Sequence, residues 1–249
     1  MDNKKEKLED FKTAISSTVR SISNSEKIEV SFGNQTPKSE RNSIKLPDLC
    51  QVNNRLNFNQ IRAMADSKSL NLRFSDDKTF KEYEPDGNIS KKLYKISEKI
   101  RCEKIGTSYF KGIKNNIEKF YHERLSGLDL KSSEDKIIES FENYLRTKFL
   151  DFKNDSKIDK KLKSYKKDLN EKFKDKINQL NEVTLDQKKF NSLISELISN
   201  MDLDENLEEE KKDENQNNDD KQDKPENQDK QAKEKEDKQE EMSIDSGMP

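Results

Sequence analysis

The C-terminal stretch of this sequence places the strongest limit on how the chain can fold. From residue 204 to residue 241, the only aliphatic or aromatic side chains besides Pro225 are Leu207 and Ala232. A segment of this composition cannot bury enough apolar surface to offset its loss of conformational entropy on folding. We therefore expect a disordered, acidic, low-complexity tail over residues 202–249 and a folded domain built from residues 1–201.

Charge divides the chain at the same place. Residues 202–249 hold 19 Asp and Glu against 8 Lys, a net charge of −11, and because the whole chain carries −2 the first 201 residues carry +9. Self-repulsion should keep the tail extended as a tether. A second reading is that the tail competes for, or folds against, the basic domain and weakens its nonspecific binding to nucleic acid.

Nothing in the sequence predicts export or insertion into a membrane. The longest apolar run is Ala63-Met64-Ala65, whereas a spanning helix needs about 20 such residues, and the N-terminus lacks an apolar core. Cys50 and Cys102 stand alone rather than as a CxxC pair, which favours reduced and inert thiols. These observations predict a soluble, cytoplasmic protein.

The apolar residues of the basic domain recur at helical spacing, which predicts a mainly α fold, a multi-helix domain with a minor β element. The first helix carries its apolar face on Leu8, Phe11, Ile15, Val19 and Ile22. Further apolar faces are expected at Phe58 to Leu72, Ile89 to Ile100 with a continuation to Tyr121 left open, Ile137 to Phe149, Ile158 to Leu180, and Phe190 to Ile198.

The minor β element is expected near the N-terminus. Residues 28–32 alternate apolar and polar side chains, which predicts one strand ended by Gly33. The polar stretch over residues 35–57 predicts a loop with a brief strand at residues 44–46. Residues 70–74 fit either a helix end or a strand, and periodicity alone does not separate the two.

Two glycines, Gly106 and Gly112, interrupt an otherwise helical stretch in RCEKIGTSYFKG. Each costs about 1 kcal/mol relative to alanine inside a helix, so such a position usually needs a close backbone approach, a bend or a helix end. A phosphate-binding loop does not fit, because the GxxxxGK[ST] order is missing and no strong strand precedes the stretch. We therefore expect close helix packing or a bend at these positions, and we favour the reading in which both glycines let helices approach each other.

The same stretch resembles the R-x-E-x-I-G…G signature of the T subunit of aerobic cobaltochelatase, carried here by Arg101, Glu103, Ile105, Gly106 and Gly112. Other pieces agree with that family in order and spacing. They are EVSF at Glu29–Phe32, Leu46-Pro47, RAMADSKSLNLRFSDDK at Arg62–Lys78 with Asp66 in its R-x-x-A-D pattern, ERLSGL at Glu123–Leu128, and LISELISNMDLDE at Leu193–Glu205. The similarity covers roughly residues 27–209.

The resemblance implies a role in assembly rather than chemistry. Proteins of this family work with an AAA+ ATPase subunit in a two-tier ring. A third, large subunit binds the corrinoid and inserts cobalt into hydrogenobyrinic acid a,c-diamide in aerobic cobalamin (vitamin B12) biosynthesis. ATP, Mg2+ and Co2+ are then used by the complex, and no cofactor, metal or catalytic residue is expected on this chain. Arg101 and Glu103 are expected to pair with each other or to contact a partner.

The sequence also departs from the family pattern. The family carries a C-terminal von Willebrand factor A domain with a DxSxS metal site, which Asp245-Ser246-Gly247 does not match before the last residue, Pro249. A shortened gene product and a fragment both fit this departure. Ala63, Met64 and Asp76 stand where the family pattern has Gly, His and His, so a metal role of those histidines is not expected here.

Other chemistry finds little support in the residues. His122 is the only histidine, which argues against a zinc cage or a Ser-His-Asp triad and favours a structural or surface residue. Asp202, Asp204 and Asn206 have the spacing of a calcium loop, but Leu207 takes the place of the required glycine.

The alternative function is a basic helical nucleic-acid-binding or scaffold protein with an autoinhibitory acidic tail. The lysine-rich segment Lys157–Lys176 motivates nucleic-acid binding, although its lysines alternate with acidic residues and no aromatic platform accompanies them. The heptad-like spacing from Ile158 to Phe173 motivates a scaffold, but the repeat slips at Ile177. Both rank below the assembly role.

Overall fold

The computed structural model describes residues 2–33, 42–48, 58–130, 132–154, 156–201 and 203. The chain divides into two units, Met1–Glu209 and Glu210–Pro249, and every described residue belongs to the first. The expected disorder of the tail, the calcium-loop spacing at Asp202 and the thiol of Cys50 lie outside the described residues. The domain boundary at residue 201 stays a prediction.

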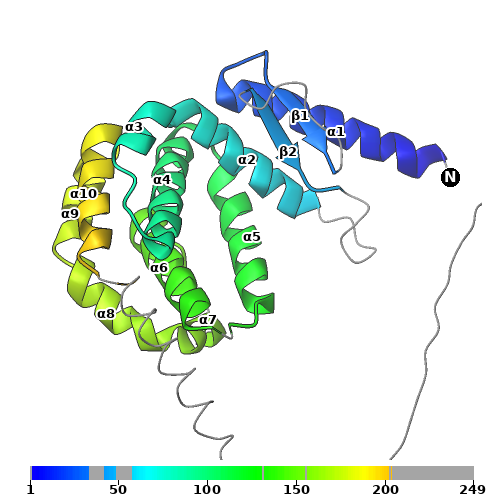
Figure 1. Cartoon of the computed structure of the whole chain (residues 1–249). Helices are drawn as coiled ribbons and strands as arrows, with labels where there is room; N and C mark the ends of the chain where they lie inside the picture. Colours follow the sequence, from blue (N-terminus) through cyan, green and yellow to red (C-terminus); the bar gives the residue numbers. More distant parts are fainter. Residues whose placement is uncertain are drawn as a thin grey trace, which may run out of the picture. The chain divides into compact units, whose positions relative to one another are not determined.

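The described part is mainly α with a small β element, which confirms the expected fold class (Figure 1). In chain order the elements are α1 (Asp2–Ser23), β1 (Glu29–Phe32), β2 (Ser43–Leu46), α2 (Phe58–Phe74), α3 (Asp77–Glu82), α4 (Asn88–Tyr109), α5 (Ile113–Gly127), α6 (Ser133–Leu150), α7 (Ser156–Lys161), α8 (Lys163–Phe173), α9 (Lys176–Glu182) and α10 (Gln187–Ser199).

At the N-terminal end, α1 and a two-stranded parallel sheet pack with α2 (Figure 1). The strands pair in register from Glu29 opposite Ser43 to Phe32 opposite Leu46. Apolar side chains fill the space between these elements and are here called the N-terminal cluster: Ile15, Val19, Ile28, Phe32, Ile44, Leu46, Ile61 and Ala65. The strand predicted at residues 28–32 and the brief strand at 44–46 are therefore confirmed.

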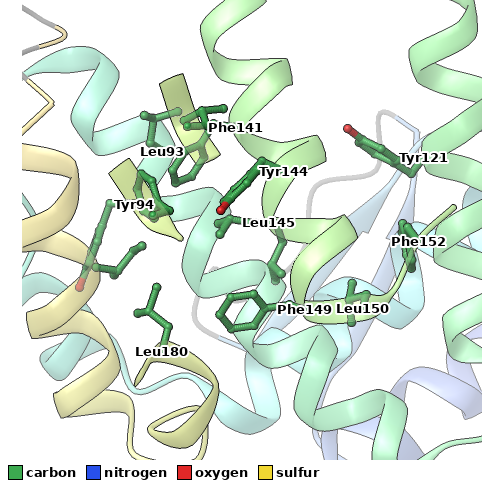
Figure 2. Packing of buried hydrophobic residues seen from close by; sticks show 14 of the residues in the cluster. Leu93, Tyr94, Tyr121, Phe141, Tyr144, Leu145, Phe149, Leu150, Phe152 and Leu180 are labelled. Atoms are coloured by element: carbon green, nitrogen blue, oxygen red, sulfur yellow. The ribbon is translucent and has the colours of Figure 1, made fainter. Parts of the chain in front are cut away.

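In the larger, helical region, α4 lies at the centre and contacts α2, α5, α6 and α10 (Figure 1). Figure 2 shows the packing of its core, to which α6 contributes Phe141, Leu145 and Phe149 and α4 contributes Leu93 and Tyr94. The rings of Phe141 and Phe173 meet edge to face at 5.7 Å, so α8 closes the same core. Burial of these apolar faces supplies the main driving force for folding.

The structure divides two of the expected helices. The helix that starts near Ile89 continues to Tyr109 and stops there, and α5 begins at Ile113. The apolar pattern from Ile158 to Leu180 forms three short helices, α7, α8 and α9, rather than one. Residues 70–74 complete α2, so the strand reading of that stretch is wrong.

Side chains mark the start of several helices. Asp76, Ser132 and Asp186 each accept a hydrogen bond from the backbone amide three residues later, which satisfies a free amide of the first turn. Gly87, with a φ of 77°, turns the chain into α4. None of the helices in the described part is both long and apolar enough to cross a bilayer.

Candidate functional site

The crossing of α2 and α4 holds the first of the two signature glycines. Gly106 is buried, and a Cβ atom at this position would overlap the side chain of Leu70 on α2. The absence of a side chain therefore leaves room for Leu70 of α2 to pack directly against the backbone of α4.

The second signature glycine has a different role, and the expectation of a helix approach at Gly112 is wrong. Its φ is 95°, a left-handed conformation that other residues rarely adopt, and a Cβ atom there would meet nothing within 4 Å. Gly112 is the N-cap of α5 and turns the chain between α4 and α5. Glycine is favoured at position 112 because of its backbone conformation and not because a side chain would lack space.

Arg101 is buried on α4 and holds three separate parts of the fold together. Its guanidinium donates two 2.8 Å hydrogen bonds to the carboxylate of Glu98, one turn earlier on the same helix. It also donates to the backbone carbonyls of Phe74, at 2.5 Å, and Thr184, at 3.0 Å. Arg101 thus links α4 to the end of α2 and to the turn before α10.

Of the two roles expected for Arg101 and Glu103, the mutual ion pair is wrong, and contact with a partner stays a prediction. Residues two positions apart on an α-helix point about 200° apart around the axis, so their side chains leave α4 in opposite directions. Glu103 instead pairs with Arg146 of α6 at 2.6 Å. Its other carboxylate oxygen accepts a 2.5 Å hydrogen bond from the hydroxyl of Ser67 on α2.

A charge network, buried at Glu103 and Arg146 and partly exposed at Arg124, extends from Glu103 across α6 to α5. We use this name for Ser67, Glu103, Arg146, Glu142, Arg124 and Glu139. Arg146 donates to both Glu103 and Glu142, and Arg124 donates to both Glu142 and Glu139. The side chains of Glu103 and Arg146 are only 0% and 2% exposed, so their pairing takes place away from solvent. The network ties α2, α4, α5 and α6 together.

The charged forms of Glu142 and Arg146 are favoured by their partners in this network. Burial alone would raise the pKa of Glu142, but the charges of Arg146, Lys99 and Arg124 lower it to about 2. Burial alone would lower the pKa of Arg146, but Glu103 and Glu142 raise it above its ordinary value. The ring of Tyr121 lies 4.9 Å from the guanidinium carbon of Arg146, which adds a cation–π contact.

Asp66, the remaining signature residue, lies beside Ser67 on α2. It is buried and accepts a 2.9 Å hydrogen bond from the side-chain amide of Asn116 on α5. Burial raises its pKa, and the hydrogen bond from Asn116 and the charge of Arg62 only partly oppose this effect. Asp66 therefore adds a polar link between α2 and α5.

A cavity of about 310 Å³ borders the charge network. Its lining includes Ala63 and Met64, two of the positions where the sequence departs from the family pattern, together with Tyr121, Arg124 and Arg146. The third departure, Asp76, caps α3 and is not among the lining residues. Within the described ranges, no group of three or more His, Cys, Asp or Glu side chains is arranged to hold a metal ion.

The remaining candidates from the sequence lie elsewhere. Cys102 is a buried free thiol, and burial raises its pKa well above the ordinary value, so the thiol stays protonated. In the lysine-rich segment, Lys166 pairs with Asp159 at 3.0 Å and Lys161 donates to the backbone carbonyls of Leu125 and Leu128. Several of these lysines thus serve the fold itself.

Sequence reasoning missed Arg124, Glu142 and Arg146. A signal for two of them is present, because Glu142 and Arg146 have the i, i+4 spacing of a helical ion pair. That spacing does not predict their burial, which the structure shows. Arg124 belongs to the ERLSGL piece, but nothing in the sequence identifies its partners.

Comparison with known families supports the resemblance seen in the sequence. A family model described as cobalamin biosynthesis protein CobT matches residues 5–247. No solved structure matches the chain. The family match corresponds to the T subunit of cobaltochelatase. This chain therefore belongs to the CobT family of cobalamin biosynthesis proteins.

Proposed function

We propose that this chain is a non-catalytic subunit that couples an AAA+ ATPase ring to the large subunit of cobaltochelatase that inserts cobalt into the corrin ring. In this role the chain transmits conformational change between partners, while ATP hydrolysis and metal insertion take place on the other subunits. Cobalt, ATP and Mg2+ are then substrates and cofactors of the complex rather than ligands of this chain.

The use of the family-signature residues carries this proposal. Arg101, Glu103, Gly106 and Asp66 all make contacts between helices that are distant in sequence. These contacts hold α2, α4, α5, α6 and the α10 region in one arrangement. Such use of the signature residues favours a rigid body. A rigid body is what a coupling subunit needs, because movement applied at one face must reach another without being absorbed.

Co-purification tests the assembly part of the proposal. The full chain, the AAA+ subunit and the large subunit would be mixed with and without ATP and separated by size-exclusion chromatography. We expect the chain to elute with the ATPase subunit when ATP is present, in an assembly of ring size. Elution of this chain alone under both conditions would remove the proposal.

A matched variant tests the non-catalytic part. Glu103→Gln combined with Arg146→Met removes an opposite-charge pair together, so no buried charge loses its only partner, since Glu142 keeps Arg124. We expect the assembled double variant to support cobalt insertion with an unchanged pH profile. Complete loss of insertion by a folded and assembled double variant would instead assign a chemical role to this pair.

A further inference from the structure

A second, larger cleft shares Ser67, Lys68 and Lys99 with the cavity beside the charge network. It has a volume of about 710 Å³ and is bordered by β2, α2, α3 and α4, with Ile138 of α6. We call it the basic cleft, because five lysines line it: Lys45, Lys68, Lys92, Lys95 and Lys99. Its volume lies within the range typical of ligand-binding clefts.

Much of the positive charge of the basic cleft is not neutralised by the protein. Lys92 pairs with Glu134 at 2.6 Å, and the ammonium of Lys99 lies 4.0 Å from Glu142. Lys45, Lys68 and Lys95 have no acidic partner in the part of the chain that the structure describes. The amine of Lys68 instead donates to the backbone carbonyl of Lys45.

The acidic residues of the basic cleft do little to balance these charges. Its lining includes only Asp77 and Glu98 among the described acidic residues, and Glu98 is already paired with the buried Arg101. The repulsion is felt by Lys68, because burial together with the charges of Lys95 and Lys99 lowers its pKa. The cleft thus presents a cationic surface that lacks its counter-charge.

The lysines of α4 form a regular row. Lys92, Lys95 and Lys99 follow the i, i+3, i+7 spacing that places side chains along one face of a helix. They extend over about 10 Å, or two helical turns. A second helix laid alongside α4 would meet this row with acidic side chains at the same spacing.

Apolar side chains line the same cleft as the lysines. Leu72 is 39% exposed, and Ile96, Ile138 and Phe80 are partly buried in the lining of the same cleft. Most of the apolar lining is aliphatic, with Phe80 as its aromatic member, whereas proteins that hold single-stranded nucleic acid offer exposed aromatic platforms for base stacking. A cleft lined by both lysines and aliphatic side chains complements an acidic peptide with one apolar face.

We infer that the basic cleft binds an acidic, amphipathic helical segment of a partner protein, through the lysine row of α4 with Lys45 and Lys68 and through apolar contact with Leu72. This inference rests on the proposed function, since a coupling subunit must dock a partner. It adds the surface that is used and the chemistry of the segment that occupies it.

Direct binding to the full chain tests the inference. The probe is a fluorescently labelled helical peptide of about 18 residues, or five turns, with a leucine face flanked by glutamates. Matched probes replace its glutamates by glutamine or its leucines by serine, and a labelled single-stranded DNA serves as the nucleic-acid arm. We expect the acidic leucine peptide to bind, with an affinity that falls as salt rises, and both matched peptides to bind at least about tenfold more weakly.

Lysine variants locate the site. Lys68→Gln combined with Lys95→Gln should weaken peptide binding by about tenfold or more. The control, Lys119→Gln combined with Lys163→Gln, removes the same charge from exposed lysines that do not line the basic cleft, and it should change binding by less than about twofold. Leu72→Ser should weaken binding without any change in charge. Circular dichroism on each variant confirms that the helices are retained.

Several outcomes would overturn the inference. Equal weakening by the two lysine pairs would show general charge attraction rather than a site. Tighter binding of DNA, lost in the Lys68/Lys95 variant, would assign the basic cleft to nucleic acid. Absence of peptide binding rejects this inference and leaves the assembly proposal to the co-purification result. Peptide binding without co-purification rejects the assembly proposal and retains the cleft.

Discussion

The two sides of α2 are stabilised by different kinds of interaction. One side contributes Ile61 and Ala65 to the N-terminal cluster, which is purely apolar. The other side meets α4 and α5 through Leu70 beside Gly106 and through Ser67 and Asp66, which bond to Glu103 and Asn116. Apolar clusters accept many arrangements of similar volume, whereas each buried charge requires its own partner. Apolar burial on the first side therefore stabilises the packing of α2, and the polar contacts on the second side fix the orientation of α2 relative to α4 and α5.

The largest effect should follow from breaking the charge network at its centre. Arg146→Met leaves Glu103 without its ion-pair partner in a buried site, so the free energy of unfolding should fall by about 3–5 kcal/mol. In the N-terminal cluster, Ile15→Leu keeps the volume and should cost at most about 1.5 kcal/mol. Urea denaturation followed by circular dichroism measures both. The contrast between the two sides fails if the two substitutions cost the same, and Glu103→Gln added to Arg146→Met should recover part of the loss.

A smaller effect is expected at the helix crossing. Gly106→Ala introduces a Cβ atom that overlaps Leu70, which should lower the free energy of unfolding by about 1–3 kcal/mol. Gly112→Ala also destabilises, but through its left-handed backbone, since no atom lies near its Cβ position. A double-mutant cycle with Leu70→Ala separates the causes, because coupling is expected with Gly106→Ala and not with Gly112→Ala. Coupling of equal size at both glycines would contradict the steric account of Gly106.

Acid should weaken the network side selectively. The pKa of Glu142 is about 2 in the folded chain against an ordinary value of 4.5, so its stabilising contribution is complete above about pH 5 and is lost as the pH falls through the folded value. Between pH 6 and pH 3 this carboxylate alone should cost about 2 kcal/mol of unfolding free energy. Asp66, whose pKa is raised, contributes in the opposite direction. The pH dependence of urea midpoints should flatten in Glu142→Gln, and an unchanged slope would exclude this carboxylate as its source.

Local patterns in the sequence predict the elements of this fold well, because apolar periodicity and strand alternation follow from geometry within each segment. The helical face from Leu8 to Ile22 and the strand at residues 28–32 are examples. The break between α4 and α5 is harder to predict, because the apolar spacing continues across it and only Gly112 marks the turn. Its left-handed backbone is a property of the chain's path rather than of the apolar pattern.

The partners of the buried charges could not be predicted from the sequence, for a related reason. Glu103 and Arg146 are separated by 43 positions, and their meeting depends on how α4 and α6 are rotated about their axes. The pairing of Arg101 with Glu98, by contrast, follows the helical i, i+3 spacing and could have been preferred over Glu103. Local charge pairs are thus readable from spacing, and long-range pairs require the packing.

The guanidinium of Arg101 has a mechanical consequence. It connects the last turn of α2 and the turn before α10 to one point on α4. Gln187 forms a second connection between these two turns through its hydrogen bonds with the backbone of Asp76. An outward movement of α10 would therefore also break hydrogen bonds at the junction of α2 and α3. These two turns, more than a hundred positions apart along the chain, should therefore loosen in concert, so that strain applied at either one is delivered to the other.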